Sequence, residues 1–126
     1  MTNYVPGVCN IGPAEIRRRR RGGLAGGAVT VAGLVAIVAL DVPRPFRLVL
    51  AIPAGMSAVG FLQARFHFCA AFGMLGVFNL GDDLGRQESV AEAADRREDR
   101  RKAAVILALS ALVGAATGAA SLLLPR

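Results

Sequence analysis

The sequence predicts an all-α integral membrane protein with three transmembrane helices, and this prediction depends on three apolar stretches. They run over residues 22–40, 46–64 and 103–124. The first and third contain no charged residue, and the second contains only Arg47, close to its start. An α-helix rises about 1.5 Å per residue, so about 20 residues cross a hydrocarbon layer about 30 Å thick. Each stretch is therefore long enough to span a membrane.

The composition favours one membrane domain over a soluble domain. Hydrophobic residues make up 54% of the 126 residues. They lie in blocks, without the regular polar faces that the helices of a soluble bundle need. We expect one domain over residues 1–126, comprising an N-terminal segment (1–21), the first two spans (22–40 and 46–64), an interfacial segment with a charged helix (65–102) and the third span (103–124).

The distribution of basic residues predicts the orientation of the chain. The net charge is +6, and the basic residues gather at the ends of the apolar stretches, which is typical of headgroup contact rather than of nucleic-acid binding. Five lie in residues 1–21 and seven in residues 65–102, whereas the other side has only Arg44, Arg47 and Arg126. Because basic residues favour the cytoplasmic side, we predict a cytoplasmic N-terminus and an outside C-terminus in a bacterial inner (plasma) membrane.

Proline and charge mark the connections. Pro13 suits the first turn of a helix, and Glu15 in that turn complements the helix dipole. The short loop at 41–47 contains two prolines and predicts an antiparallel hairpin of the first two spans. Pro53 leaves a backbone carbonyl without its helical donor and predicts a local irregularity in the second span.

The segment between the second and third spans is apolar at first and charged later. Residues 66–80 are too few to cross a membrane comfortably. We therefore interpret residues 65–81 as an extension of the second span followed by an interfacial or re-entrant piece. Residues 86–102 contain strong helix formers with mixed charge and predict a solvated helix that leads directly into the third span.

Small residues recur at the spacing of paired helices. Gly22 and Gly26, and likewise Gly23 and Gly27, stand four apart in the first span. In the third span Ser110, Gly114 and Gly118 form one row, with a second row beside it made of Ala111, Ala115 and Ala119. Such rows let backbones approach closely within a membrane. They predict packing within the chain, between copies or against another protein.

Three reactive side chains are predicted to share the cytoplasmic side. They are Cys9, His67 and Cys69, the only cysteines and the only histidine of the chain. Two thiolates and an imidazole are suitable ligands for a tetrahedral zinc ion. His67 and Cys69 are two residues apart, so they converge only outside a helix. The alternative is structural, with both cysteines as small apolar residues and the histidine hydrogen-bonded at the interface.

Catalytic signatures are absent from the sequence. No ionisable residue lies in the middle of a span, which argues against an ion-coupled transporter. A cluster of phenylalanines at positions 66, 68, 72 and 78 is typical of packing at the membrane surface. A quinone or lipid groove, or an enzyme acting on lipid there, is the alternative interpretation.

Two stretches resemble parts of a known group of proteins. YVPGVCNIGPAEIRRRR (4–20) and FLQARFHFCAAFGMLGVFN (61–79) are similar to stretches of a family of small uncharacterised bacterial integral membrane proteins. That family has no established activity, so the resemblance implies no catalytic role. It implies that the two stretches form one feature on the cytoplasmic side.

Taken together, these patterns favour a non-catalytic small membrane protein. We expect an accessory or assembly subunit of a larger membrane complex, or a homo-oligomer, with the lipid bilayer and other membrane proteins as partners. The alternative function is a membrane-anchored metal-binding or thiol-redox module that uses Cys9, His67 and Cys69, with zinc as the cofactor.

Overall fold

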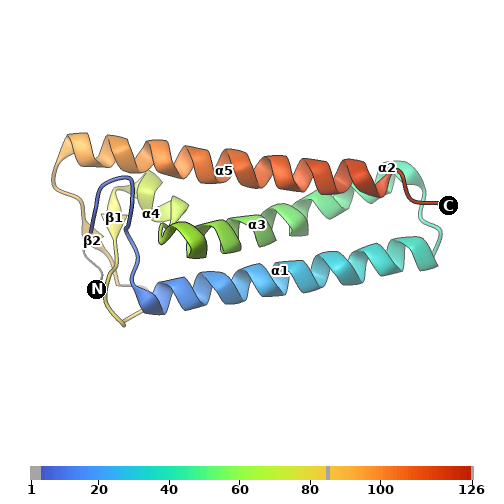
Figure 1. The fold of residues 1–126 in the computed structure, drawn as a ribbon, viewed down its shortest axis with the longest axis horizontal. Helices are drawn as coiled ribbons and strands as arrows, with labels where there is room; N and C mark the ends of the chain where they lie inside the picture. Colours follow the sequence, from blue (N-terminus) through green and yellow to red (C-terminus); the bar gives the residue numbers. More distant parts are fainter. Residues whose placement is uncertain (1–3, 85, 126) are drawn as a thin grey trace.

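A computed structural model describes residues 4–84 and 86–125 of the chain, which are mostly helical (Figure 1). Residues 1–3 and Arg126, which were counted in the predicted orientation, lie outside the described residues. Three helical segments in this part of the chain are long and apolar enough to cross a membrane, which confirms the predicted fold class. They are α1 (Pro13–Ala39), the run Arg44–Phe66 made of α2 (Arg44–Arg47), η1 (Leu48–Leu50) and α3 (Ala51–Phe66), and α5 (Ala93–Ser121).

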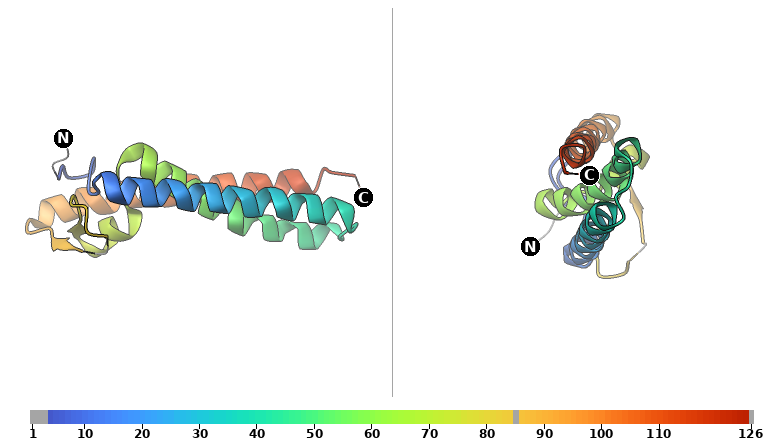
Figure 2. Two further views of the ribbon diagram at one scale, coloured as in Figure 1. Left: turned by 90° about the horizontal axis from the view of Figure 1, so that it is seen from below. Right: turned by 90° about the vertical axis from the view of Figure 1, so that its right-hand side faces the viewer.

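The three long helices form a bundle in which α3 lies between α1 and α5 (Figure 1). Both α1 and α5 run antiparallel to α3, so the arginine-rich starts of α1 and α5 lie at one end of the bundle. Figure 2 shows that the N-terminal loop and the segment that joins α3 to α5 gather at this same end, away from the C-terminus. The predicted grouping of the two basic segments is therefore present in the fold.

Glycines bring α3 into close contact with both neighbouring helices. A Cβ atom added to Gly60 would lie 2.5 Å from the backbone nitrogen of Gly23 in α1. On the other side of α3, a Cβ added to Gly114 of α5 would lie 2.6 Å from the carbonyl oxygen of Ala51. No side chain fits at these points, so the small-residue rows of α1 and α5 pack, at least in part, within the chain.

The start of the second span is irregular, as its proline predicts. The 3₁₀ turn η1 precedes α3, and the Ala51 N–H is donated to the carbonyl of Leu48 in the tighter 3₁₀ pattern. Pro53 has no N–H to donate to the carbonyl of Val49, the partner it would have in an α-helix. The tighter turn therefore lies where the α-helical hydrogen-bond pattern is interrupted.

Arg47 closes the opposite end of the bundle. The sequence places it among the outer basic residues; the structure puts it at that end but buries its side chain completely. Its guanidinium donates to the carbonyl of Val42 (3.1 Å) and to those of three residues at the end of α5, namely Ser121 (3.0 Å), Leu124 (2.8 Å) and Pro125 (3.3 Å). A cation at this position satisfies carbonyls that the helix end leaves unpaired and complements its dipole.

The segment after α3 turns and does not span. The helix α3 ends at Phe66, two residues past the predicted limit of the span at residue 64. His67 follows it in the left-handed conformation (φ 55°). The six-residue helix α4 (Ala70–Leu75) then packs against α5. A small antiparallel pair of strands follows, β1 (Val77–Phe78) with β2 (Glu88–Ser89).

The predicted helix over residues 86–102 is wrong in its first part. Residues 88 and 89 form β2, and α5 begins only at Ala93. The Val90 N–H is donated to the carbonyl of Gly76 (2.8 Å), and Arg96 donates to the carbonyls of Val90 and Ala91. These tertiary bonds keep the segment extended despite its local helix propensity.

We predict that Gly114→Ala lowers stability whereas Gly118→Ala does not. The new methyl group at Gly114 meets the Ala51 carbonyl, and such overpacking costs roughly 1–3 kcal/mol. A Cβ at Gly118 meets its nearest atom, the Ala51 Cβ, at 3.4 Å, which is close to ordinary contact. Thermal unfolding of both variants in the same mild detergent gives the comparison. Equal melting temperatures would contradict the close α3–α5 contact.

We also predict that Arg47→Ala destabilises the protein by roughly 1–3 kcal/mol, because the buried Ser121 carbonyl and the carbonyls that follow α5 lose their donor. Arg44→Ala is the matched control, since Arg44 is an exposed arginine of the same short helix, α2. Thermal unfolding reports the overall loss, and amide hydrogen exchange over residues 118–124 locates it. The same small effect for both arginines would show that Arg47 does not cap the helix.

Candidate functional site

The candidate site is the end of the bundle where the N-terminal loop meets α4. The loop forms a tight hairpin in which Val5 and Cys9 exchange two backbone hydrogen bonds, both 2.9 Å long. Gly7 at its tip has φ +69°, a conformation that glycine adopts readily. This turn directs the Gly7 N–H toward α5.

Asp99 of α5 holds this hairpin in place. Its carboxylate accepts hydrogen bonds from the Gly7 N–H (2.8 Å) and from the Tyr4 hydroxyl (2.6 Å), and its side chain is fully buried. Burial and the nearby Asp99 carboxylate raise the pKa of Tyr4, because both disfavour the phenolate. Tyr4 therefore stays a neutral donor and anchors the loop.

Asn10 joins the N-terminal loop to the segment that follows α3. Its side-chain amide donates to the Cys69 carbonyl (3.1 Å) and accepts from the Cys69 N–H (2.6 Å). Its backbone N–H is donated to the His67 carbonyl, and its own carbonyl accepts from the Asn79 N–H. All these partners are backbone groups, and they satisfy the polar atoms of the fully buried Asn10.

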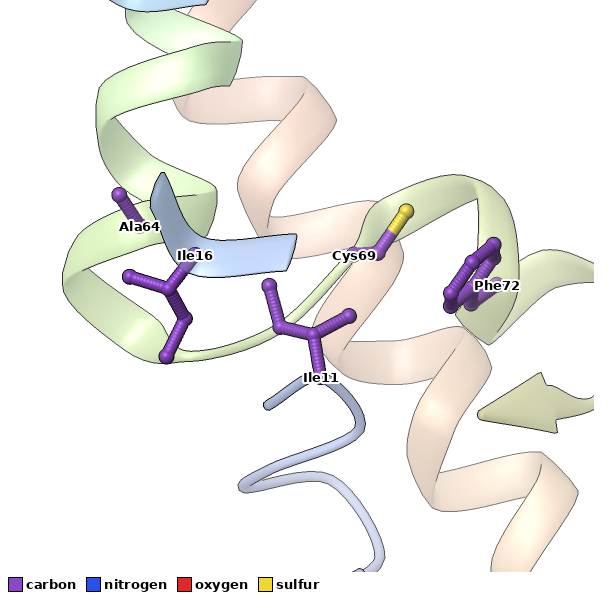
Figure 3. Packing of buried hydrophobic residues seen from close by; sticks show 5 residues of the cluster. All are labelled: Ile11, Ile16, Ala64, Cys69 and Phe72. Carbon is purple, nitrogen blue, oxygen red and sulfur yellow. The ribbon is translucent and has the colours of Figure 1, made fainter. Parts of the chain in front are cut away.

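An apolar cluster lies beneath these bonds, and Figure 3 shows its five members, Ile11, Ile16, Ala64, Cys69 and Phe72. They come from the N-terminal loop, α1, α3 and the start of α4. Residues of the stretches 4–20 and 61–79 therefore pack together as one feature.

Glu15 and Arg19 form a charged contact at the edge of this cluster. The Glu15 side chain is fully buried in the first turn of α1, and one of its oxygens lies 3.4 Å from Arg19 Nη1 and 3.6 Å from Arg18 Nη1. The other oxygen, Oε2, has no hydrogen-bond partner among the described residues. Arg19 also lies 3.0 Å from the Cys69 sulfur through Nη2 and 5.6 Å from the centre of the Phe72 ring.

The three predicted zinc ligands lie at this end but in different surroundings. Cys9 is partly exposed, with its sulfur 3.5 Å from the Ile11 carbonyl. Cys69 is buried against Arg19, while His67 is exposed and caps α3. Within residues 4–84 and 86–125, no three His, Cys, Asp or Glu side chains are arranged to hold a metal ion. The zinc site therefore stays a prediction from the sequence.

The phenylalanine cluster is used in packing, which the sequence favoured over a ligand groove. Phe72 is buried in the cluster of Figure 3, and Phe68 is buried in a second cluster with Ala70, Ala103 and Ile106. Phe66 packs against the second cluster and lies beneath Lys102, whose Nζ is 4.3 Å from the ring centre. Phe78 stacks on Tyr4 with ring centres 4.6 Å apart.

The sequence interpretation missed the roles of the partly buried Arg19 and of the buried Asp99, because each stands in a charged run. Helical spacing contained the signal: Glu15, Arg19 and Gly23 are four apart on α1, and Asp99 precedes Ala103 by four on α5. The buried neighbours in these rows indicate that Arg19 and Asp99 face inward.

Comparisons of the chain with protein-family models, with curated proteins and with solved structures found no match. The site must therefore be interpreted from its own chemistry. Its buried polar groups join separate elements of the fold. Arg19 has five N–H groups, so it keeps donors beyond those that contact Glu15 and Cys69.

We predict that maleimide reagents modify Cys9 much faster than Cys69 in the folded protein. Only 2% of the surface of Cys69 is exposed, whereas Cys9 is partly exposed. Burial raises the pKa of the Cys9 thiol, so its rate should rise at a higher pH than that of a free cysteine. Cys9→Ser and Cys69→Ser separate the two signals. Equal rates would contradict the packing of Cys69.

The zinc prediction is tested separately, by metal analysis of these two variants and of His67→Ala.

Proposed function

We propose that this chain is a non-catalytic integral membrane protein that acts as an accessory or assembly subunit. In this proposal it associates, through outward faces of its helices, with other membrane proteins or with further copies of itself. Its N-terminus is cytoplasmic, and the resemblance to bacterial membrane proteins favours the inner membrane.

The observation that carries this proposal is the exposure of apolar surface along the bundle. Only 11% of the apolar window of α1 and 28% of that of α5 are buried within the chain. Large apolar side chains point outward along both helices, such as Val31 (62% exposed) and Leu112 (65%). Soluble monomers rarely expose continuous apolar surface of this kind. Lipid and neighbouring helices are the environments that suit it.

The second small-residue row of α5, which consists of alanines, supports a specific face for association. Ser110, Gly114 and Gly118 are buried, and the glycines of this row pack against α3 or η1. Ala111, Ala115 and Ala119 are exposed, so they are available to a helix outside this chain. Close packing of small residues drives helix association in lipid, where burial of apolar surface contributes little.

The proposed orientation is supported by the common end of the two arginine-rich segments. An impermeant maleimide on intact spheroplasts and on opened membranes tests it through Cys9. Labelling of Cys9 only in opened membranes agrees with a cytoplasmic N-terminus, and labelling in intact spheroplasts would contradict it.

We predict that Ala115→Leu weakens association while leaving the monomer fold intact. Ala115 is exposed, so the larger side chain enlarges the proposed contact face without entering the bundle. Ala120→Leu is the matched control, because position 120 is also exposed and lies about 140° away around the helix. Native mass spectrometry from mild detergent gives the size of the assembly, and thermal unfolding checks the fold.

The expected result is a smaller assembly for Ala115→Leu alone. If the unsubstituted protein is monomeric when purified alone, the same pair of variants is compared for co-purification with a defined membrane partner. A chain that stays monomeric and retains no partner, or an Ala115→Leu variant that assembles normally, would overturn the proposed use of this face.

A further inference from the structure

Two shallow grooves meet on one side of the bundle beside Arg19. The first runs between α1 and α3 and has a volume of about 560 Å³. The second lies between α3, α4 and α5 and has a volume of about 540 Å³. Arg19, Val59 and Gln63 line both grooves, so the two hollows share one polar end.

Away from Arg19, the first groove is apolar and open. Ala25, Val29, Met56 and Val59 line it, and Val29 and Met56 expose 59% and 66% of their surface. From Arg19 to Val29 the helix advances about 15 Å, about half the thickness of a hydrocarbon layer. The groove therefore has the length and polarity of the space that one acyl chain fills in one leaflet.

Gly22 leaves part of this groove unfilled. A Cβ atom at Gly22 would meet nothing within 4 Å, in contrast to Gly26, where it would lie 2.9 Å from the Ser57 backbone nitrogen. Close helix packing thus accounts for Gly26. Gly22 instead lies on the open side of α1, where a side chain would occupy the groove.

The shared end of the grooves is positively charged. Arg18 and Arg19 line the first groove and face the single carboxylate of Glu15, which leaves one net positive charge on this group. The neighbouring Arg17, Arg20 and Arg21 are exposed and add to it. These arginines end where the apolar stretch of α1 begins, so they lie at headgroup depth in the membrane proposed above.

We propose that this surface binds one anionic diacyl phospholipid. The headgroup phosphate accepts hydrogen bonds from Arg18 and Arg19, one acyl chain follows the α1–α3 groove, and the other enters the groove beneath α4. Glu15 and Cys69 position the Arg19 guanidinium, whose bonds to them occupy two of its five N–H groups. The positive charge selects an anionic headgroup over a zwitterionic one.

The experiment is native mass spectrometry of the protein released from nanodiscs that hold equal amounts of phosphatidylglycerol and phosphatidylcholine with identical acyl chains. The expected result is one retained phosphatidylglycerol per chain, in clear preference to phosphatidylcholine. Arg18→Gln should reduce this preference about fivefold, because one juxtamembrane cation is lost. Gly22→Leu should reduce retention of both lipids, because its side chain fills the groove.

Arg97→Gln is the matched control, since Arg97 is an exposed arginine of α5 at the same end of the bundle. Circular dichroism and the melting temperature verify that each variant keeps its fold. Equal retention of the two lipids, an equal loss with Arg97→Gln, or normal retention with Gly22→Leu would overturn the proposal. Occupation of the groove by a second copy, seen as a dimer that Gly22→Leu dissociates, would also overturn it.

This inference rests on the membrane location proposed above but not on association through α5. The two proposals fail separately, because Ala115 lines neither groove. Loss of lipid selectivity would leave the effect of Ala115→Leu on assembly unchanged.

Discussion

The close approach of α3 to both neighbouring helices is the contact on which the rest of the structure depends. At Gly60 the α1 backbone occupies the space of a side chain, and at Gly114 the α3 backbone does the same. Helices surrounded by lipid gain little from removing apolar surface from their solvent, so packing and hydrogen bonds must hold them together. The glycines supply that packing, and the Ser57 hydroxyl adds a hydrogen bond of 2.7 Å to the Gly23 carbonyl.

Polar contacts then hold each end of the bundle. At one end Arg47 donates hydrogen bonds to carbonyls of the loop before α2 and of the end of α5. At the other, Asn10 and Asp99 attach the N-terminal loop to the backbone after α3 and to α5. The middle of the bundle therefore packs through small residues, and the charged and amide groups form their hydrogen bonds at the two ends.

The sequence predicts the three long helices because the requirement for crossing lipid is mainly one of composition and length. It also predicts the start of α1 at Pro13 and the irregular start of the second span near Pro53. It does not predict that residues 86–92 lie outside the helix. One bond that holds this segment goes to Gly76, which is distant in the sequence, and the others come from Arg96, which local pattern assigns to the helix itself.

In the candidate site, too, the sequence pattern predicts which segments meet but not which side chains join them. The pairing of residues 4–20 with 61–79 was expected, but the residues that achieve it were not identified as a set. Arg19, for example, has the same residue type as the other four arginines in its run. A run of identical residues does not show which member faces inward. The spacing of Arg19 from Glu15 and Gly23, four residues in each case, does show it. The zinc ligands could be proposed from residue type, yet their distances depend on the turn at His67, which no local pattern indicated.

The buried position of Arg47 has a consequence for the order of biosynthesis. Its acceptors on α5 follow it by 74 to 78 residues, so a ribosome delivers the donor long before the acceptors. In the membrane location proposed above, the first helical hairpin is made while this guanidinium has the Val42 carbonyl but none of its distal acceptors. The last helix therefore brings the acceptors that complete this end of the bundle.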